Sequence, residues 1–153
     1  MSAVTRPPNR LLQALPSAEY AQLHPLLETV ELTKETALAD AGAPVQRVYF
    51  PHAGVVSMMV NLSDGQSVEI ATIGRDGIVG ASAALHERPP LADAIVVVPG
   101  TASVMRAEDF REAANRSAEF RTLVALYEQA LMAQTQQSVA CNVSHPVDRK
   151  SVG

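Results

Sequence analysis

The spacing of apolar residues divides the chain into a helical zone, a strand zone and a second helical zone. Residues 9–27 form the first zone and predict two short helices, because Asn9 and Ser17 are good N-caps. Pro16 should end the first helix, and Pro25 should kink or divide the second. The first zone is therefore helical but short.

Residues 28–106 predict β-strands separated by tight turns. Val68 and Ile70 alternate with Glu69 and Ala71, as in a strand with one buried face. Glycines and prolines recur at short intervals and no helix is expected between the strands, which favours an antiparallel fold over a parallel sheet. The predicted fold class is mainly β with flanking helices, an antiparallel β-roll or jelly roll. The expected strands are 29–34, 46–50, 55–62, 66–73, 94–98 and 101–105.

Helical spacing returns after the strands. A short helix is expected over 107–115, and Ser117 is a suitable cap for a long helix from 118 to about 143. Residues at alternating four- and three-residue steps form a seam typical of helix pairing, which predicts a homodimer; a helix packed only on its own domain is the alternative. The seam comprises Phe120, Val124, Tyr127, Leu131, Gln134 and Ser138, continued by Cys141. The residues expected to face the strands are Leu123, Leu126 and Ala130.

Composition excludes several classes of protein. An apolar content of 47% is too high for a disordered chain, and 12 basic and 16 acidic residues argue against direct contact with DNA or an anionic membrane. The single cysteine, Cys141, excludes an intrachain disulfide and fits a reducing cytoplasm. The longest apolar stretches, 53–60 and 94–98, fall far below the roughly 20 residues of a membrane helix. We therefore expect a cytoplasmic domain without membrane contact.

Residue types that serve catalysis or metal binding do not occur in the required patterns. The sequence lacks serine-hydrolase, P-loop, dinucleotide-binding and Cys-x-x-Cys motifs, so an enzyme is not expected and no catalytic residue is assigned. His52 and His86 alone do not supply the histidine cluster of a cupin-type metal site. Cys141 and His145 could share a helix face, but two ligands are too few for a metal. No metal and no resident cofactor are expected.

The segment from Gly74 to Gly80 is the most unusual stretch of the chain. Its glycines stand at every third position, 74, 77 and 80. Such glycines allow tight turns and leave backbone N–H groups open to an anion. Arg75 could add a charged donor to such a site. A plain corner between two strands explains the same spacing, so both interpretations stay open at this point.

Several short motifs occur in a specific order along nearly the whole chain. They are Leu11-Leu12 to Leu15-Pro16, 26–32, Val48-Tyr49-Phe50-Pro51, Gly54-Val55-Val56-Ser57, Asp64-Gly65, Val68-Glu69-Ile70-Ala71, 74–80 and Ala140-Cys141-Asn142. In this order they resemble the Crp/Fnr family of bacterial transcription regulators. The resemblance implies a cyclic-nucleotide-binding-type β-roll followed by a long dimerisation helix. The implied division is a disordered N-terminus (1–8), a sensor domain (9–106), a short helix with the dimerisation helix (107–145) and a truncated tail (146–153).

The resemblance also implies a ligand site, which departs from the family pattern at its phosphate-binding cassette. Family members that bind cyclic nucleotide have a Glu after the cassette glycine, and an Arg followed by Ser or Thr for the cyclic phosphate. Here Ala81 follows Gly80, Leu91-Ala92 stands near the position of the pair, and Arg88 is displaced. Burying an unpaired anion is costly, so cAMP and cGMP are not the expected effectors. The ligand-site candidates are Arg75, Gly77, Gly80, Ala81, Arg88, Leu91, Ala92 and Thr135.

The family continues beyond the long helix into a winged helix-turn-helix that reads DNA. The resemblance fades at Arg149-Lys150, so we expect the DNA-binding module to be missing from this chain. The expected function is the effector-sensing and dimerisation domain of a Crp/Fnr-type regulator, with the effector unidentified. The alternative is a stand-alone β-roll module that regulates a protein partner.

Overall fold

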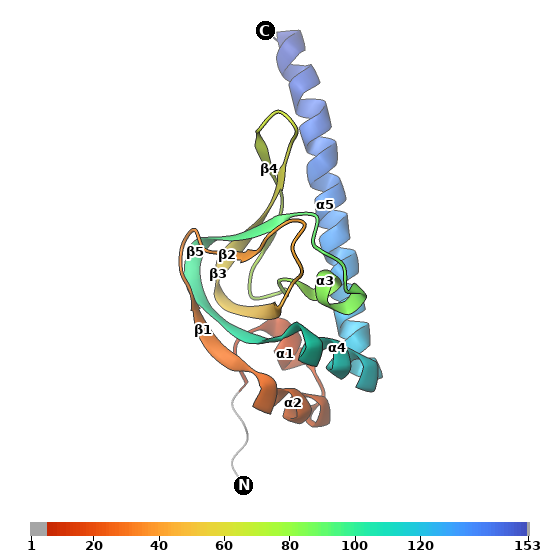
Figure 1. Cartoon of the computed structure of the whole chain (residues 1–153). Coiled ribbons are helices and arrows are strands. Elements are labelled where there is room, and N and C mark those ends of the chain that lie inside the picture. The colour runs from red at the N-terminus through yellow and green to blue at the C-terminus, as the bar shows by residue number, and fades with distance from the viewer. Residues whose placement is uncertain (1–5, 153) are drawn as a thin grey trace.

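The computed structural model describes the backbone of residues 6–152 and the side chains of residues 6–138. Short helices precede the strands, and the long helix α5 stands upright beside them (Figure 1). The helical elements are α1 (Arg10–Ala14), α2 (Ser17–Leu23), the 3₁₀ turn η1 (His24–Leu26), α3 (Ala81–His86), α4 (Ala107–Arg116) and α5 (Ala118–Val152). The strands are β1 (Glu28–Leu32), β2 (Ala37–Ala39), β3 (Arg47–Asn61), β4 (Ser67–Ile73) and β5 (Asp93–Arg106).

Some sequence predictions concern the two ends of the chain. The side chains of Cys141 and His145 lie outside the described residues, and so does the predicted seam beyond Ser138. Helix α5 extends past its predicted end at about residue 143. Of the predicted disordered segment 1–8, the structure describes only residues 6–8.

The strands pair antiparallel in the order β1-β5-β3-β4, and β2 pairs with β5. Strands β3 and β5 form the longest ladder, from Arg47 opposite Arg106 to Met59 opposite Asp93. This arrangement confirms the predicted fold class, an antiparallel jelly-roll-type sheet with flanking helices. The predicted strand pair 94–98 and 101–105 is one continuous strand, and so is the pair 46–50 and 55–62.

Glycine is the reason that β3 and β5 continue where the sequence predicts breaks. The ladder between them is irregular around residues 51–56, where Gly54 lies against Val98 and Gly100. Gly54 has a φ of +95°, and a Cβ there would lie 2.6 Å from the Val98 carbonyl oxygen. A Cβ on Gly100 would overlap the carbonyl group of Ala53. These glycines therefore bend a continuous strand pair instead of ending the strands.

Helix α3 overturns the expectation that no helix lies between the strands. It follows Gly80, whose φ of +91° sets the turn into the helix, and it ends at Glu87 with φ +49°. The side chain of Arg111 on α4 donates a hydrogen bond of 2.9 Å to the Ala84 carbonyl oxygen. The helix spans six residues, which is too short for an apolar period to reveal it.

The helix caps were predicted with mixed success. Asn9 caps α1 as predicted, because its Oδ1 accepts hydrogen bonds from the Leu11 and Leu12 backbone. Its Nδ2 also donates to the carbonyl oxygens of Pro51 and Gly77, which ties α1 to the sheet. The prediction for Ser17 is wrong, since α2 begins at Ser17 and has no side-chain cap.

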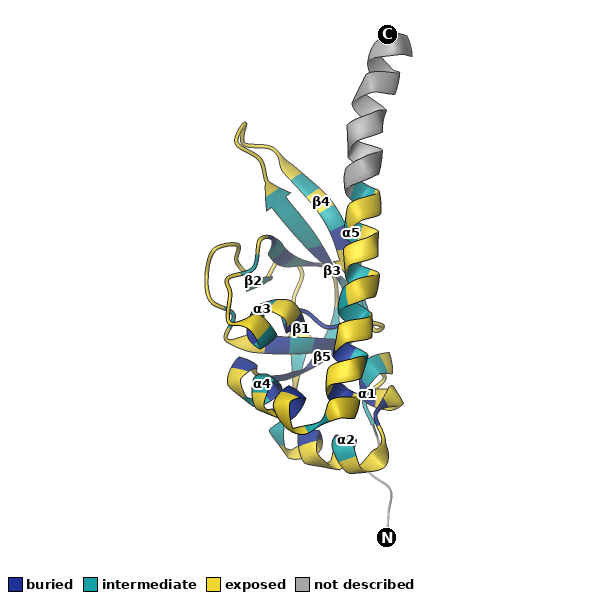
Figure 2. Ribbon diagram, turned by 90° about the vertical axis from the view of Figure 1, so that its right-hand side faces the viewer, coloured by how far each residue is buried: buried dark blue, intermediate teal, exposed yellow. Residues whose placement is uncertain are grey.

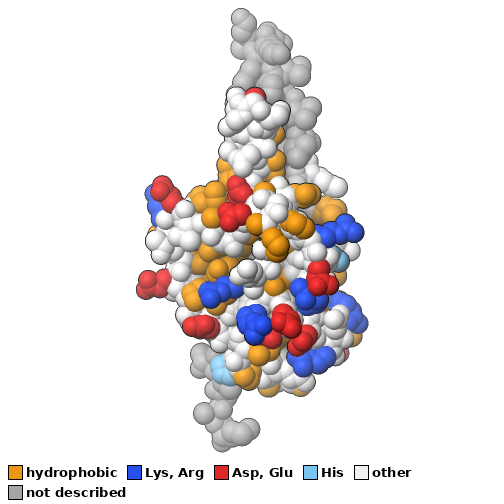
Figure 3. Space-filling view, viewed as in Figure 1, with side chains coloured by type: hydrophobic (Ala, Val, Ile, Leu, Met, Phe, Trp, Pro, Cys, Tyr) orange, Lys and Arg blue, Asp and Glu red, His pale blue; other side chains and the backbone are white. Residues whose placement is uncertain are grey.

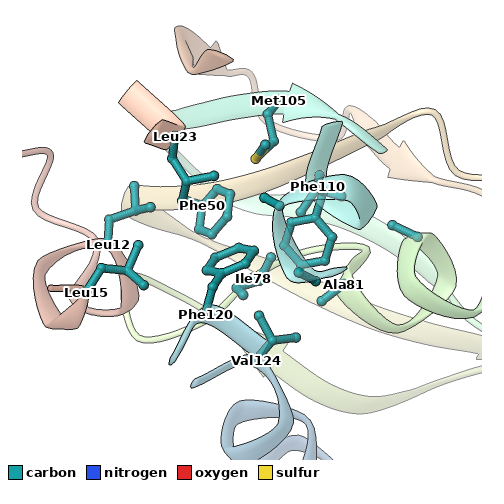
Figure 4. Packing of buried hydrophobic residues seen from close by; sticks show 14 of the residues in the cluster. Leu12, Leu15, Leu23, Phe50, Ile78, Ala81, Met105, Phe110, Phe120 and Val124 are labelled. Atoms are coloured by element: carbon teal, nitrogen blue, oxygen red, sulfur yellow. The ribbon is translucent and has the colours of Figure 1, made fainter. Parts of the chain in front are cut away.

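The core consists of two buried clusters. In the first, α1, α2, α4 and α5 pack on one end of the sheet, and the rings of Phe50, Phe110 and Phe120 meet in its centre (Figure 4). The Phe110 and Phe120 rings make an edge contact with centroids 5.3 Å apart. The second cluster lies within the sheet, around Val56 and Val96. In the described part of the long helix, residues 118–138, Phe120 and Val124 near its start are buried and the outer face is exposed (Figure 2).

The structure corrects the predicted dimer seam on α5. Phe120 and Val124 are 3% and 1% exposed in the first core cluster, so they are unavailable to a second chain. Tyr127 and Leu131 pack against the two clusters, and Gln134 Oε1 accepts a hydrogen bond of 2.8 Å from the Thr72 backbone N–H. Phe120 and Val124 therefore belong to the domain's own core, whereas Gln134 is exposed and the homodimer stays a prediction. Leu126, which was expected to face the strands, is instead 57% exposed, and Ser138 is half-buried.

We expect His52 to make the stability of the fold depend on pH. Its Nε2 lies 2.6 Å from Ser103 Oγ, its Nδ1 lies 3.3 Å from Thr101 Oγ1, and burial lowers the pKa of His52 below its usual value. The unfolded chain then takes up a proton more readily, so stability present above about pH 6.5 should be lost as the pH falls toward the folded-state pKa. We expect His52→Gln to reduce the loss of Tm between pH 7.5 and 5.5, measured by circular dichroism. An equal loss in the variant and the wild type would contradict this assignment.

Candidate functional site

A cavity of about 780 Å³ lies between the sheet, α3 and α5. Met58, Ile73 and Ala94 supply part of its wall from the sheet, and Leu131 faces them from α5. The cavity brings together side chains that are far apart in the sequence. Of the predicted ligand-site residues, it is lined by Gly80, Ala81, Arg88, Leu91, Ala92 and Thr135.

The end of the segment from Gly74 to Gly80 forms part of one wall of this cavity. Val79 exchanges two backbone hydrogen bonds with Tyr49, which fixes the end of the segment against β3. Gly80 then turns the chain into α3, with Val45 and the Arg47 backbone close to its Cα. As a result Val79, Gly80 and Ala81 face the cavity in succession.

Arg75 and Gly77 do not line the cavity. Arg75 is exposed, and its carbonyl oxygen accepts a hydrogen bond of 2.8 Å from the Arg10 backbone N–H. A Cβ on Gly77 would lie 2.7 Å from a ring carbon of Tyr127, so the missing side chain allows α5 to pack closely. Both positions therefore lie at the corner that joins α1, the sheet and α5, outside the lining of this cavity.

Helix α5 forms one wall of the cavity. Glu128, Leu131, Met132 and Thr135 line it at helical spacing, and Thr135 Oγ1 donates a hydrogen bond to the Leu131 carbonyl oxygen. Of these residues, sequence analysis assigned only Thr135 to the ligand site; it placed Leu131 in the dimer seam and did not single out Glu128 and Met132. Their three- and four-residue spacing was a usable signal, since it marks a face adjacent to the predicted seam.

Two polar atoms on this wall make no hydrogen bond of good geometry to a described residue, although the Ile78 backbone lies near the first of them. They are the Tyr127 hydroxyl and Glu128 Oε1, and both are buried. Burial raises the pKa of Tyr127 to about 12, which keeps the hydroxyl protonated. The other carboxylate oxygen of Glu128, Oε2, lies 3.9 Å from His86 Nε2 at the exposed end of α3. Nothing in the local sequence distinguishes these two polar groups from surface residues.

The cavity has few charged groups. His86, Arg88 and Glu128 are the charged or titratable side chains that line it besides Tyr127. Arg88 is exposed, Leu91 is 91% exposed, and Ala81 is buried. The positions that the family resemblance assigns to the ribose carboxylate and the phosphate arginine therefore carry apolar side chains. The arrangement can enclose a small molecule but has no buried cation to hold a phosphate.

Two other features are absent from the described part of the chain. No group of three or more His, Cys, Asp or Glu side chains there could hold a metal ion. Likewise, no helix in the described residues is both long enough and apolar enough to span a membrane.

The chain was compared with known families and structures. The family model for the cyclic nucleotide-binding domain matches residues 29–117. The search of curated proteins found no match. Among solved structures, the N-terminal domain of a transcriptional regulator from Streptomyces coelicolor A3(2) is 21% identical with a TM-score of 0.61, covering 86% of this chain and 92% of that one.

Two longer proteins have the same fold. The catabolite activator protein of Thermus thermophilus is 20% identical with a TM-score of 0.63, covering 88% of this chain and 61% of that one. The regulatory subunit of a cAMP-independent protein kinase A from Trypanosoma brucei is 18% identical with a TM-score of 0.61, covering 84% and 43%. The chain thus spans less than two thirds of both of these proteins, and the similarity to them concerns the fold.

Proposed function

The chain belongs to the cyclic nucleotide-binding domain family, and from this membership we propose that it is the effector-sensing domain of a Crp/Fnr-type transcription regulator, with α5 as its dimerisation helix. One observation carries the proposal: α5 forms a wall of the cavity through Glu128, Leu131 and Thr135. A molecule in the cavity therefore contacts the helix that would transmit the signal. Such an effector acts by binding one position of that helix better than another.

The dimer interface in this proposal is the outer face of α5. Leu126 is 57% exposed, Ala130 and Ala133 are exposed, and Leu123 is half-buried at the edge of the same face. These residues follow each other at three- and four-residue steps, which suits close packing of two helices. Sedimentation equilibrium of the chain should show a dimer, and a monomer at high micromolar concentration would contradict the proposal.

The remaining parts of the proposal concern DNA binding, cofactors and the location of the domain in the cell. With a net charge of −4, the chain is poorly suited to bind DNA itself, so DNA contact is assigned to a helix-turn-helix module outside residues 1–153. The domain acts by binding and not by catalysis, needs no resident metal or cofactor, and works in the cytoplasm without membrane contact.

The effector is a molecule other than cAMP or cGMP. We expect isothermal titration calorimetry to show no binding of either nucleotide tighter than about 100 μM, which corresponds to about −5.5 kcal/mol. The physical reason is that Ala81 and Leu91 leave the cyclic phosphate and ribose without charged partners. Tight binding of cAMP to the wild type would overturn this expectation.

A paired variant tests the same reason from the opposite direction. Ala81→Glu combined with Leu91→Arg supplies the missing carboxylate and guanidinium, and it should tighten cAMP binding at least about tenfold. The matched control is Ala81→Gln with Leu91→Gln, which adds polar side chains of similar length without charge. An equal gain in both variants would show that charge at these positions is not what the wild type lacks.

A second function has support from one similarity. The Trypanosoma brucei protein of this fold is a kinase regulatory subunit, so a module that regulates a protein partner is the alternative. The reading frame of the full transcript separates the two, since a helix-turn-helix encoded after residue 148 favours the transcription regulator.

A further inference from the structure

The chemistry of the cavity wall indicates which class of molecule it accommodates. Most of its lining is apolar, with Met58, Ile70 and Ile73 on the sheet side and Leu131 on the helix side. An apolar wall favours an apolar occupant, because covering it removes hydrocarbon surface from water. The hydrophobic side chains in Figure 3 gather beside α5, above the mixed charged surface over α4.

Two large hydrophobic side chains that line the cavity are also exposed to solvent. Leu91 is 91% exposed and Met132 is 62% exposed, and both line the cavity. Leu91 follows Pro89 and Pro90, which restrict the backbone of the loop that presents it. An apolar molecule that fills the cavity would shield part of both side chains from water.

The charge of the site opposes an anionic occupant. The carboxylate of Glu128 belongs to the wall, and the basic side chains of Arg88 and His86 are exposed. A negative group held in the interior would face Glu128 without a buried cation to offset the repulsion. These considerations exclude a nucleotide phosphate and favour a molecule without negative charge.

We infer that the effector is an uncharged, mainly apolar small molecule. This inference rests on the proposed sensor function and names its ligand class. Such a molecule contacts α5 on the face formed by Glu128, Leu131 and Thr135, while Leu126 and Ala130 lie on the outer face. Binding therefore stabilises one position of α5 relative to the sheet. Because the proposed dimer interface is the outer face of the same helix, that interface moves with it.

Two fluorescent dyes that differ by one charged group test the inference. N-phenyl-1-naphthylamine is uncharged and apolar and has one N–H donor, whereas 8-anilino-1-naphthalenesulfonate adds a sulfonate to the same skeleton. We expect fluorescence titration of the full chain to give an affinity for the uncharged dye at least about tenfold higher than for the anionic dye, with no displacement by 1 mM cAMP. Equal affinity for the two dyes, or displacement by cAMP, would overturn the ligand class.

Matched variants establish that the dye occupies this cavity. Thr135→Phe fills the cavity from α5, and Gln136→Phe adds the same ring at the next, exposed position outside the lining. The first should abolish binding of the uncharged dye and the second should leave it unchanged. Glu128→Gln removes the negative charge, so it should narrow the difference between the two dyes. Equal loss in both phenylalanine variants, or an unchanged difference in Glu128→Gln, would contradict the assignment.

Sedimentation of the same samples separates this inference from the proposed function. A dimer that does not bind the uncharged dye would overturn the ligand class and leave the dimerising sensor intact. A monomer that binds the dye as expected, with loss in Thr135→Phe only, would support the ligand class and contradict the role of α5 in dimerisation.

Discussion

Gly100→Ala should lower the free energy of unfolding by at least about 3 kcal/mol. A Cβ at this position would overlap the carbonyl group of Ala53 and approach Gly54, and these are backbone atoms that cannot move aside like the end of a flexible side chain. The β3–β5 ladder would have to separate at its bend, which is central to the sheet. The loss should be measured by urea unfolding monitored by circular dichroism, and it is a large part of the stability of a typical domain.

Gly74→Ala is the matched control for this substitution. A Cβ on Gly74 would meet only the Gly54 carbonyl oxygen, at an ordinary contact distance of 3.7 Å. We expect its unfolding free energy to stay within about 1 kcal/mol of the wild type. If both variants unfolded at the same urea concentration, close backbone approach at Gly100 would not explain the bend in β3 and β5.

Leu126→Glu should weaken dimerisation by about a hundredfold, or about 2.8 kcal/mol, because it places a charge in the apolar helix contact proposed for the outer face of α5. Leu126 is 57% exposed in the single chain, so the substitution should leave the fold intact. Sedimentation equilibrium gives the association constant, and circular dichroism reports whether the fold is retained.

Ala125→Glu provides the comparison, since this exposed neighbour is turned by about 100° from Leu126 around the helix. It should dimerise like the wild type. Equal weakening in the two variants would mean that the effect is general repulsion between acidic chains, and dimerisation that survives Leu126→Glu would place the interface elsewhere.

Local sequence signals predicted the elements that depend on local physics. Asn9 and Ser117 were identified as caps because a short polar side chain can satisfy a free backbone N–H, and both do so. Pro25 divides the second helix as expected, with α2 ending at Leu23 and a 3₁₀ turn following. These signals act within a few residues, so they could be interpreted without the rest of the fold.

The orientation of α5 could not be predicted in this way. An apolar seam such as Phe120, Val124 and Tyr127 suits a partner helix and a sheet equally well, since both offer an apolar surface. The structure pairs the seam with the chain's own core and leaves Leu126 exposed. The direction of a helix face depends on the elements that pack against it, and their position is a property of the whole fold.

The candidate site, like the orientation of α5, could be predicted only in part from the sequence. Six of the eight candidate positions line it, but they were carried by the family resemblance and not by spacing alone. The buried groups of Tyr127 and Glu128 were missed because burial is not visible in a sequence. Arg75 was included because an arginine among glycines suits an anion, but in the fold it is exposed and does not line the cavity.

The sequence by itself determined the antiparallel β class, the long final helix and the caps at Asn9 and Ser117, because these depend on residue type and near-neighbour spacing. Only the tertiary structure decided which face of α5 is buried, that Gly54 and Gly100 bend continuous strands, and that Glu128 lines the cavity. These features arise where segments far apart in the chain meet, and the free energy of such contacts is shared between partners that no local pattern identifies.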